Sequence, residues 1–430
     1  MKRPRTPKYS PADVKRAWEY ADTRDVIGAV FNYNKWYLHW EELKRRDLPV
    51  DPPLYVWILM KTFRERDMKY VSFDDLQLKY NLLDNFLEKL HFLDKSQREA
   101  FHPASIRCPH ERNQFIINSL MEEAIASSQI EGAAVTRTIA KKMLREKRKP
   151  ATKDERMILN NYIAMKRITQ IKDEELTPPE LILETHKTIT RDTLEDPNDE
   201  GRFRDNNEIR VFDFRGNVLH TPPDFASIEG LIGGELCAFA NNDDGQFIHP
   251  VIKGIILHFL MGYIHPFNDG NGRTARSIFY WYMLRKDYWL FEYMAVSRAI
   301  KDTEGGQYKL AYLYTESDEN DLTYFIRYSL AAVKTAVDNI QKYIEKKQKE
   351  SKQTVTILQK NEGLSLRQAE IVKSLIKHPD KPITIKEIVE TYHVAYGTAR
   401  NDLFRLEELG YLAKRKSGKE YIFIFRGLKE

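Results

Sequence analysis

Residues 265–276 read HPFNDGNGRTAR, and this stretch decides the fold and the chemistry expected of the chain. The run before it, residues 251–264, is apolar at most positions and predicts a buried helix. That helix should end at His265, because the proline that follows disfavours helical backbone in the residue before it. A second helix is predicted to begin at about Gly272. The stretch is therefore expected to be a loop between two helices.

Backbone and cationic groups of this loop suit the binding of phosphate. Gly270 and Gly272 allow the backbone to turn its N–H groups inward as an anion-binding nest. The amino end of the second helix adds a dipole that favours negative charge. Arg273 and Arg276 are three positions apart on that helix, so both can grip phosphate oxygens from one side.

Two further side chains add a metal ligand and a base. Asp269 offers a hard oxygen ligand of the kind that Mg²⁺ prefers. His265, which titrates near neutral pH, is suited to act as a general base on a hydroxyl. A calcium loop starting at Asn268 is the alternative, but its twelfth position is Phe279, where an EF-hand needs a glutamate. We interpret the segment as a site that binds phosphate and a metal ion next to a general base.

The segment HPFNDGNGRTAR resembles the signature of the Fic family, HPFx[D/E]GN[G/K]RxxR, and matches it at every defining position. The resemblance covers about residues 116–345 and implies a mainly α-helical catalytic core that transfers AMP from ATP to a hydroxyl of a target protein. It implies His265 as the base and Asp269 as the Mg²⁺ ligand. The residues implied for ATP and phosphate binding are Gly270, Asn271, Gly272, Arg273, Thr274, Ala275, Arg276 and Tyr308. Because the related Doc branch, which phosphorylates its target, carries lysine in place of Gly272, AMP transfer is favoured.

A second motif lies upstream, at the end of an amphipathic stretch that predicts a helix. Residues 127–132 read SSQIEG and resemble the family's inhibitory helix, pattern [S/T]xxxE[G/N]. By itself, Glu131 would be a solvated charge that opposes the helix dipole, and Gly132 a helix stop. The resemblance implies instead that Glu131 pairs with Arg276 and blocks placement of the ATP γ-phosphate, with Ser127 one turn away on the same face.

Residues 207–221 follow the segment GRFR at 201–204 and predict a β-hairpin that turns at residues 215–217. One interpretation is an exposed hairpin on a helical protein, with its edges protected. In Fic-like proteins the corresponding flap lies over the active site and holds the target backbone by strand addition. The resemblance therefore implies a target protein bound along this hairpin.

The rest of the chain up to residue 365 is expected to be mainly helical. Helices are predicted in the core at 113–131, 136–146, 152–171, 178–191, 224–241, 248–264, 272–286 and 321–349. The N-terminal region, 1–115, shows helical stretches around 11–45, 53–65 and 73–92, and we assign a packing role to Trp18, Trp36, Trp40 and Trp57. Residues 346–365 are predicted to be a charged connector.

Residues 366–430 resemble a winged helix-turn-helix domain, with a recognition helix at 396–409 and a two-stranded wing after it. The candidate contacts to duplex DNA are Thr398, Arg400, Asn401 and Arg405, together with the wing residues Lys414, Arg415, Lys416 and Lys419. The segment carries 13 basic and 9 acidic side chains, a modest excess for a DNA-binding domain. Winged helices also bind proteins, so both kinds of partner stay open.

The composition fits several ordinary globular domains. Hydrophobic residues make up 42% of the 430 residues, and no window has the run of about 18 apolar residues that a membrane span needs. The two cysteines lack metal-ligand spacing, and a cytoplasmic location is the simplest expectation. A net charge of +5 does not by itself imply nucleic acid.

We therefore expect a protein adenylyltransferase that uses ATP and Mg²⁺ and modifies a Ser, Thr or Tyr hydroxyl of a target or of itself. We expect Glu131 to inhibit this activity by competing for Arg276. Two alternatives stay open. The same site could remove AMP from a target, with Glu131 orienting a water, or the chain could be a DNA-binding regulator with a nucleotide-sensing core. The intact His265 favours catalysis, because a sensor would not need the base. The number of subunits is not fixed, and a homodimer is one option.

Overall fold

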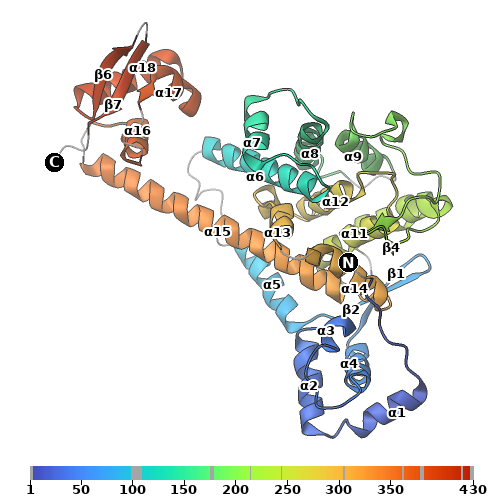
Figure 1. Ribbon diagram of the computed structural model, residues 1–430. Coiled ribbons are helices and arrows are strands. Elements are labelled where there is room, and N and C mark those ends of the chain that lie inside the picture. The colour runs from blue at the N-terminus through green and yellow to red at the C-terminus, as the bar shows by residue number, and fades with distance from the viewer. Residues whose placement is uncertain are drawn as a thin grey trace. The chain divides into compact units, whose positions relative to one another are not determined.

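The computed structural model contains two compact units, residues 1–340 and 341–430, and each is described by itself (Figure 1). The structure describes residues 3–97, 109–174, 179–213, 215–243, 245–303, 306–360, 363–377, 382–417 and 420–426. Both units are mainly helical, as predicted, with a few short strands. Within these ranges, no helix combines the length and the apolar character needed to cross a membrane.

Four helices open the first unit: three short ones divide the helical stretch predicted over residues 11–45, and the fourth matches the stretch predicted over 53–65. They are α1 (Pro11–Glu19), α2 (Arg24–Lys35), α3 (Trp40–Leu43) and α4 (Leu54–Arg66). The start of α1 is set by a capping box in which Ser10 and Asp13 each bond the other's backbone N–H. Trp57 is buried among these helices, whereas Trp18 and Trp36 are 47% and 58% exposed. Burial confirms the predicted packing role for Trp57, and the half-exposed Trp18 ring lies 6.5 Å from that of Phe63.

A β-hairpin replaces the first part of the helix predicted over residues 73–92. Strand β1 (Lys69–Phe73) pairs antiparallel with β2 (Leu76–Tyr80), and the helix that follows is α5 (Asp84–Lys95). Val71 and Phe73 point inward, and Leu78, opposite Val71, is fully buried. Asp74 makes the turn with a positive φ of 50°. The helix prediction was wrong here because the alternating period-two pattern of the segment fits a strand.

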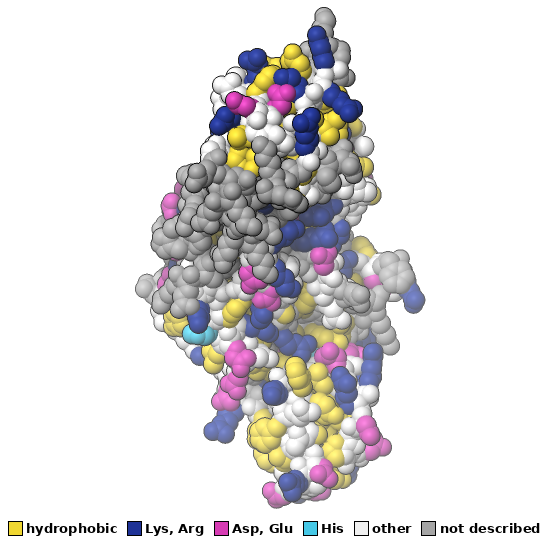
Figure 2. Space-filling model, turned by 90° about the vertical axis from the view of Figure 1, so that its left-hand side faces the viewer, with side chains coloured by type: hydrophobic (Ala, Val, Ile, Leu, Met, Phe, Trp, Pro, Cys, Tyr) yellow, Lys and Arg dark blue, Asp and Glu magenta, His cyan; other side chains and the backbone are white. Residues whose placement is uncertain are grey.

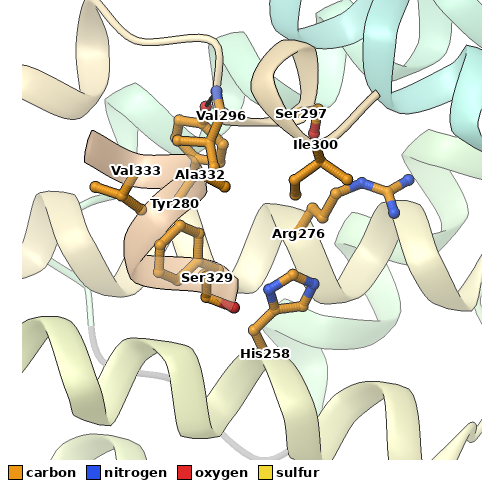
Figure 3. Close-up of a pocket in the computed structure, with 10 residues that line it drawn as sticks. His258, Arg276, Tyr280, Val296, Ser297, Ile300, Ser329, Ala332 and Val333 are labelled. Atoms are coloured by element: carbon orange, nitrogen blue, oxygen red, sulfur yellow. Dashed lines mark hydrogen bonds between the residues drawn. The ribbon is translucent and has the colours of Figure 1, made fainter. Parts of the chain in front are cut away.

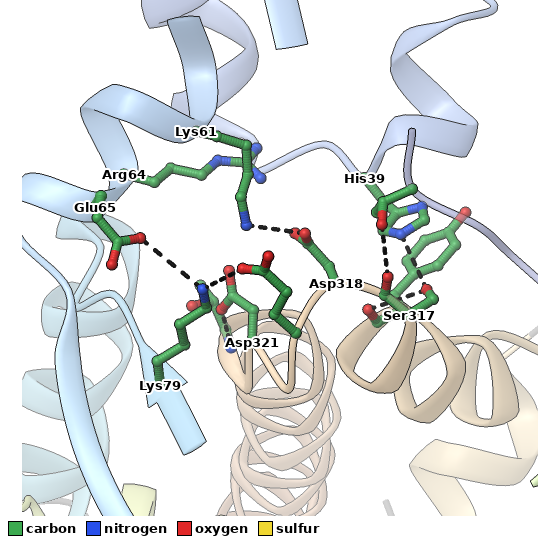
Figure 4. A network of polar contacts seen from close by, with 12 residues as sticks. His39, Lys61, Arg64, Glu65, Lys79, Ser317, Asp318 and Asp321 are labelled. Carbon is green, nitrogen blue, oxygen red and sulfur yellow. Dashed lines mark hydrogen bonds and ion pairs between the residues drawn. The ribbon is translucent and has the colours of Figure 1, made fainter. Parts of the chain in front are cut away.

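Buried charges join this N-terminal layer to the turn between α14 (Gln307–Ser317) and α15 (Thr323–Lys360) (Figure 4). Lys61 Nζ donates to Asp318 Oδ1 at 2.9 Å, and the Tyr37 hydroxyl donates to Asp321 Oδ2 at 2.6 Å. The Arg64 guanidinium lies 3.9 Å from the centre of the Tyr37 ring. Since these groups are buried, the N-terminal layer and the turn must pack together to neutralise them.

Two apolar helices, α11 (Pro250–Ile264) and α12 (Asn271–Arg285), lie side by side at the centre of the first unit. Three helices pack against α12: α6 (Pro109–Ile130), α8 (Lys153–Gln170) and α9 (Glu180–Thr190). The other helices are α7 (Arg137–Glu146), α10 (Cys237–Asn241) and α13 (Val296–Asp302). The helix predicted at 224–241 is interrupted, because a short 3₁₀ turn at Phe225–Ser227 and a π-helical segment at Gly230–Leu236 precede α10. Residues 346–360 of the predicted connector lie in α15.

In its described part, the second unit combines the end of α15 and three further helices with a small sheet. Its elements are α16 (Leu366–Lys377), β5 (Ile383–Thr384), α17 (Ile385–Tyr392), α18 (Tyr396–Glu408), β6 (Leu412–Ser417) and β7 (Glu420–Phe425). The strands lie in the order β5-β7-β6, so the structure adds a third strand to the predicted two-stranded wing. Leu403 and Leu406 of α18 pack against Phe423 in the core. The predicted wing contact Lys419 lies outside the described residues.

Candidate functional site

The loop between α11 and α12 is held by its own side chains. His265 ends α11 with left-handed backbone, φ 49° and ψ 58°, a conformation that is unfavourable for a side chain with a Cβ. The Asn271 side-chain amide makes two hydrogen bonds with the Phe267 backbone: it accepts from the N–H at 2.9 Å and donates to the carbonyl at 2.8 Å. These two bonds use the amide oxygen and one of the two Nδ2 hydrogens of Asn271, and they fix the orientation of its side chain. Thr274 N–H and hydroxyl both donate to the Gly270 carbonyl, at 3.0 and 2.9 Å.

His265 has the protonation state of a base. Its Nδ1 lies 3.3 Å from the Gly262 carbonyl, which can only accept, so Nδ1 carries the proton and Nε2 keeps its lone pair. Burial lowers the pKa of His265 to about 4, and the ring is therefore neutral at neutral pH. Behind the loop, Arg204 Nε donates to the His265 carbonyl at 3.1 Å, and the Arg204 N–H donates to the Pro266 carbonyl at 2.9 Å.

Both arginines of the loop are buried and only partly paired. Arg273 Nη1 donates to the Ile189 carbonyl at 3.2 Å. Arg276 Nε donates to Ser127 Oγ at 2.8 Å, and its Nη2 donates to the Ser127 carbonyl and to Glu131 Oε1, both at 2.9 Å. Arg273 Nε and Arg276 Nη1 make no hydrogen bond within the described part of the chain. Buried donors of this kind are unfavourable unless an acceptor, such as an anion or an ordered water, binds there.

The Glu131 carboxylate lies against the amino end of α12. Helix α6 ends at Ile130, and Gly132 follows with a positive φ of 98°. A Cβ added to Gly272 would lie 2.1 Å from Glu131 Oε1, so the carboxylate rests directly on the glycine backbone. Burial alone would lower the pKa of Arg276, but the adjacent Glu131 charge raises it. A carboxylate thus lies where a helix amino end would bind phosphate.

Asp269, the predicted metal ligand, is open to solvent, with 63% of its side chain exposed. Its Oδ1 accepts the Gly270 N–H at 2.5 Å and lies 3.8 Å from Arg273 Nη2. Across the described ranges, no group of three His, Cys, Asp or Glu side chains could hold a metal alone. A single exposed carboxylate beside two buried arginines fits Mg²⁺, which binds through few carboxylates plus substrate phosphates.

A small pocket lies beside Arg276 (Figure 3). Its lining includes His258, Tyr280 and Ser297 as well as apolar residues of α13 and α15. The Tyr308 hydroxyl lies 2.9 Å from His258 Nε2. The structure therefore brings Tyr308 to the His258 side of this pocket.

The predicted hairpin is formed by β3 (Val211–Phe212) and β4 (Val218–His220), which are shorter than expected. The turn places Gly216 at φ 77°, while Phe214 lies outside the described residues. His220 fastens the hairpin to two helices: its Nε2 lies 2.8 Å from the Tyr263 carbonyl of α11, and its Nδ1 lies 2.9 Å from Glu316 Oε2 of α14.

Two residues of this site were missed by the sequence analysis. His186 of α9 lies with its Nε2 2.8 Å from the Asp269 carbonyl, and burial lowers the pKa of His186 to about 4. Arg204 supports the loop through His265 and Pro266 and also donates to the Pro223 carbonyl beyond the hairpin. The segment GRFR was the one available signal for Arg204, and no motif marked His186.

The candidate DNA contacts lie on α18. Arg400, Asn401 and Arg405 are exposed, and Thr398 is half-buried. The Arg400 guanidinium lies 4.8 Å from the centre of the Phe404 ring, and Arg405 Nη1 donates to Glu408 Oε2 at 2.6 Å. Two of the four side chains thus make contacts within the domain that DNA binding would have to accommodate.

The chain is similar to known protein families both in the region of the α11–α12 loop and in the C-terminal unit. The Fic/DOC family model matches residues 175–283, and the model of the DeoR-like helix-turn-helix domain matches residues 367–422. The protein adenylyltransferase Fic of Drosophila ananassae is 32% identical over 133 residues, 30% of this chain and 24% of the fly protein. That of Drosophila yakuba is 33% identical over 107 residues, 25% of this chain and 20% of the fly protein. The chain thus matches about a quarter of the length of these relatives.

Two solved structures share the fold. A Fic family protein from Desulfovibrio desulfuricans superposes with a TM-score of 0.52 and 18% identity, covering 80% of this chain and 96% of that one. Fic-1 from C. elegans, residues 134–508, superposes with a TM-score of 0.51 and 16% identity, covering 79% and 90%. The chain therefore carries a Fic domain, followed by a DeoR-like helix-turn-helix domain.

Proposed function

We propose that the Fic domain transfers AMP from ATP to a hydroxyl group of a protein. The observation that carries this proposal is the intact base, a neutral His265 with an available Nε2, beside two buried arginines with unpaired donors. The relatives named protein adenylyltransferase Fic support the same reaction. A nucleotide sensor would need the arginines but would have no use for the base.

In the proposed reaction, the hydroxyl oxygen of the target attacks the α-phosphorus of ATP. His265 Nε2 takes the hydroxyl proton, the bond from the α-phosphorus to the bridging oxygen breaks, and pyrophosphate leaves. Arg273, Arg276 and the backbone N–H groups at the start of α12 hold the phosphates. Asp269 would hold Mg²⁺, which when bound neutralises phosphate charge.

Glu131 is the proposed restraint on this reaction. Its carboxylate uses one donor of Arg276 and lies on the backbone of Gly272, so it competes with an anion for both. The target would add as a strand along the hairpin at 207–221, where Phe212 and Val218 are 51% and 41% exposed.

Intact-mass analysis after incubation with ATP and Mg²⁺ tests the proposal. The variant Glu131→Gly should gain at least one AMP, wild type much less, and Glu131→Gly/His265→Ala none. Each sample should also be incubated with a cell extract and ATP labelled on the α-phosphate, because the chain need not modify itself. Labelling that is equal with and without His265 would refute the proposal.

A second direction, hydrolytic removal of AMP from a target at the same site, has one specific observation in its favour. The Glu131 side chain is 32% exposed, so its carboxylate can also orient a water. Incubating AMP-modified product with wild type and with Glu131→Gly separates the two directions, because hydrolysis would require Glu131.

We also propose that the C-terminal unit binds duplex DNA. The match to a DeoR-like helix-turn-helix domain and the exposed Arg400 and Asn401 on α18 support this. Filter binding at low salt tests it, and a protein partner is the alternative outcome.

A further inference from the structure

We infer that His186, on the neighbouring helix α9, is a positioning residue for AMP transfer. Its ring contacts the Asp269 carbonyl and the Phe267 ring, and these contacts fix the loop that carries the base. This inference rests on the proposed function. His186 does not touch the reacting groups directly; it acts through the backbone of the loop.

Both nitrogens and one face of the His186 ring are engaged. The side chain is fully buried, its Nε2 lies 2.8 Å from the Asp269 carbonyl, and its Nδ1 accepts the Gly201 N–H at 3.0 Å. The ring stacks on Phe267 with centroids 3.6 Å apart and planes 4° from parallel. His186 therefore contacts the loop at two points, Asp269 and Phe267, and also contacts Gly201 in the segment that leads into the hairpin.

These partners fix the tautomer of the ring. The Gly201 N–H can only donate, so His186 Nδ1 must present a lone pair. The proton of the neutral ring is then on Nε2, where it is donated to the Asp269 carbonyl, which can only accept. Neither contact survives a change of tautomer, because an Nδ1–H would then face the Gly201 N–H and the Nε2 lone pair would face the Asp269 carbonyl oxygen.

The loop packs directly on α9 at this point. A Cβ added to Gly270 would lie 2.7 Å from Thr190 Cγ2 and 3.2 Å from His186 Nε2. The exposed Asp269 carboxylate has few other constraints, since its contacts are the Gly270 N–H and the distant Arg273. The direction of that carboxylate is therefore set mainly by its own backbone, which His186 holds. A shift of about 1 Å in a group that orients substrate can cost on the order of 100-fold in rate.

Two substitutions separate the contacts of the ring. His186→Gln places an amide nitrogen near the position of Nε2, so it can donate to the Asp269 carbonyl but cannot accept from Gly201. His186→Asn places an amide oxygen near the position of Nδ1, so it accepts from Gly201 but does not reach Asp269. Glu184→Gln, an exposed change on the same helix, is the matched control.

We expect His186→Asn, made in the Glu131→Gly background, to lower kcat for AMP transfer about 100-fold with a KM for ATP changed by less than threefold. His186→Gln should stay within about tenfold of the parent, and Glu184→Gln should match it. Equal losses in both His186 variants would overturn the inference, because they would indicate a general packing role. Full activity in His186→Asn would also overturn it.

Binding gives a readout that does not depend on turnover. Calorimetric titration of ATP should show the same affinity in His186→Asn and parent without Mg²⁺, and a smaller gain in affinity on adding Mg²⁺ in the variant. An unchanged Mg²⁺ effect would overturn the inference. If the Glu131→Gly parent transfers no AMP, the proposed function fails, and this titration alone decides the role of His186.

Discussion

Glu131 and Arg276 form an ion pair across the amino end of α12, with Oε1 2.9 Å from Nη2. The two partners differ in their access to water, since the Arg276 side chain is 3% exposed and that of Glu131 is 32% exposed. Glu131 can therefore rotate toward solvent while Arg276 stays buried on Ser127. The pair can open without movement of α6, and Arg276 then lacks its hydrogen-bonded counter-charge until an anion replaces the carboxylate.

We predict that Glu131→Gly is less stable than wild type without nucleotide and is stabilised more by ATP and Mg²⁺. Removing one partner of a fully buried pair costs about 3–5 kcal/mol, and about 1–3 kcal/mol is expected here because Glu131 is partly exposed. A ligand that supplies the missing charge recovers stability by mass action. Urea unfolding with and without saturating ATP and Mg²⁺ measures both effects.

Glu131→Gln is the control for loss of charge at nearly constant shape. It should reproduce most of the nucleotide effect, because the neutral amide competes poorly for the guanidinium. The competition model is wrong if ATP and Mg²⁺ raise the urea midpoint of wild type as much as that of either variant.

The buried position of His265 predicts an unusual pH profile. Because burial lowers its pKa to about 4, His265 stays in the basic form until the pH approaches that value. In Glu131→Gly, kcat/KM for ATP should therefore change little between pH 7.5 and 5.5. A histidine with an ordinary pKa of about 6.5 would lose roughly 90% of its basic form over the same range. Initial rates measure the profile, with thermal unfolding at each pH to exclude denaturation. An acid limb near pH 6.5 would contradict the prediction.

The position of the loop between α11 and α12 could be predicted because its residues are local in sequence. Pro266 ends one helix and Gly270 permits the turn into the next, so His265, Asp269 and Arg273 follow at fixed spacing. The supports of the loop could not be predicted in this way. His186 reaches the loop only because α9 packs on α12, a tertiary contact that leaves no local pattern.

The fold was predicted least well where short strands interrupt helices. Residues 69–80 carry a period-two pattern in only two short strands, and the helical periodicity of α5 immediately follows. Strand β5 has two residues, too few for any periodicity, and it exists because β7 offers a pairing edge. Such elements depend on their partners more than on their own sequence.

The ion pair between Lys61 and Asp318 should matter greatly for stability. Their side chains are 9% and 3% exposed, so Lys61→Met leaves a buried carboxylate without its closest cation. We expect a loss of about 3–5 kcal/mol in the free energy of unfolding, measured in urea. The matched control is Lys142→Met, whose partner Glu146 is 4.0 Å away and whose side chain is 73% exposed. That change should stay within about 0.5 kcal/mol of wild type. Equal effects of the two changes would contradict the role assigned to the buried network.

DNA binding by the full chain should depend on two kinds of side chain in the C-terminal unit. Asn401→Ala, on the exposed face of α18, should weaken binding to a preferred duplex while leaving the salt dependence unchanged, because the contact is uncharged. Lys416→Ala, exposed on the wing strand β6, should weaken binding to all sequences. It should also lower the slope of log K against log salt by about 0.9, as expected for one lost phosphate contact.

Fluorescence anisotropy from low to physiological salt measures the affinity and the slope, and Lys142→Ala in the first unit controls for the loss of one positive charge. If Lys416→Ala and Lys142→Ala change the slope equally, the binding is non-specific attraction to the whole chain and the wing has no particular part in it.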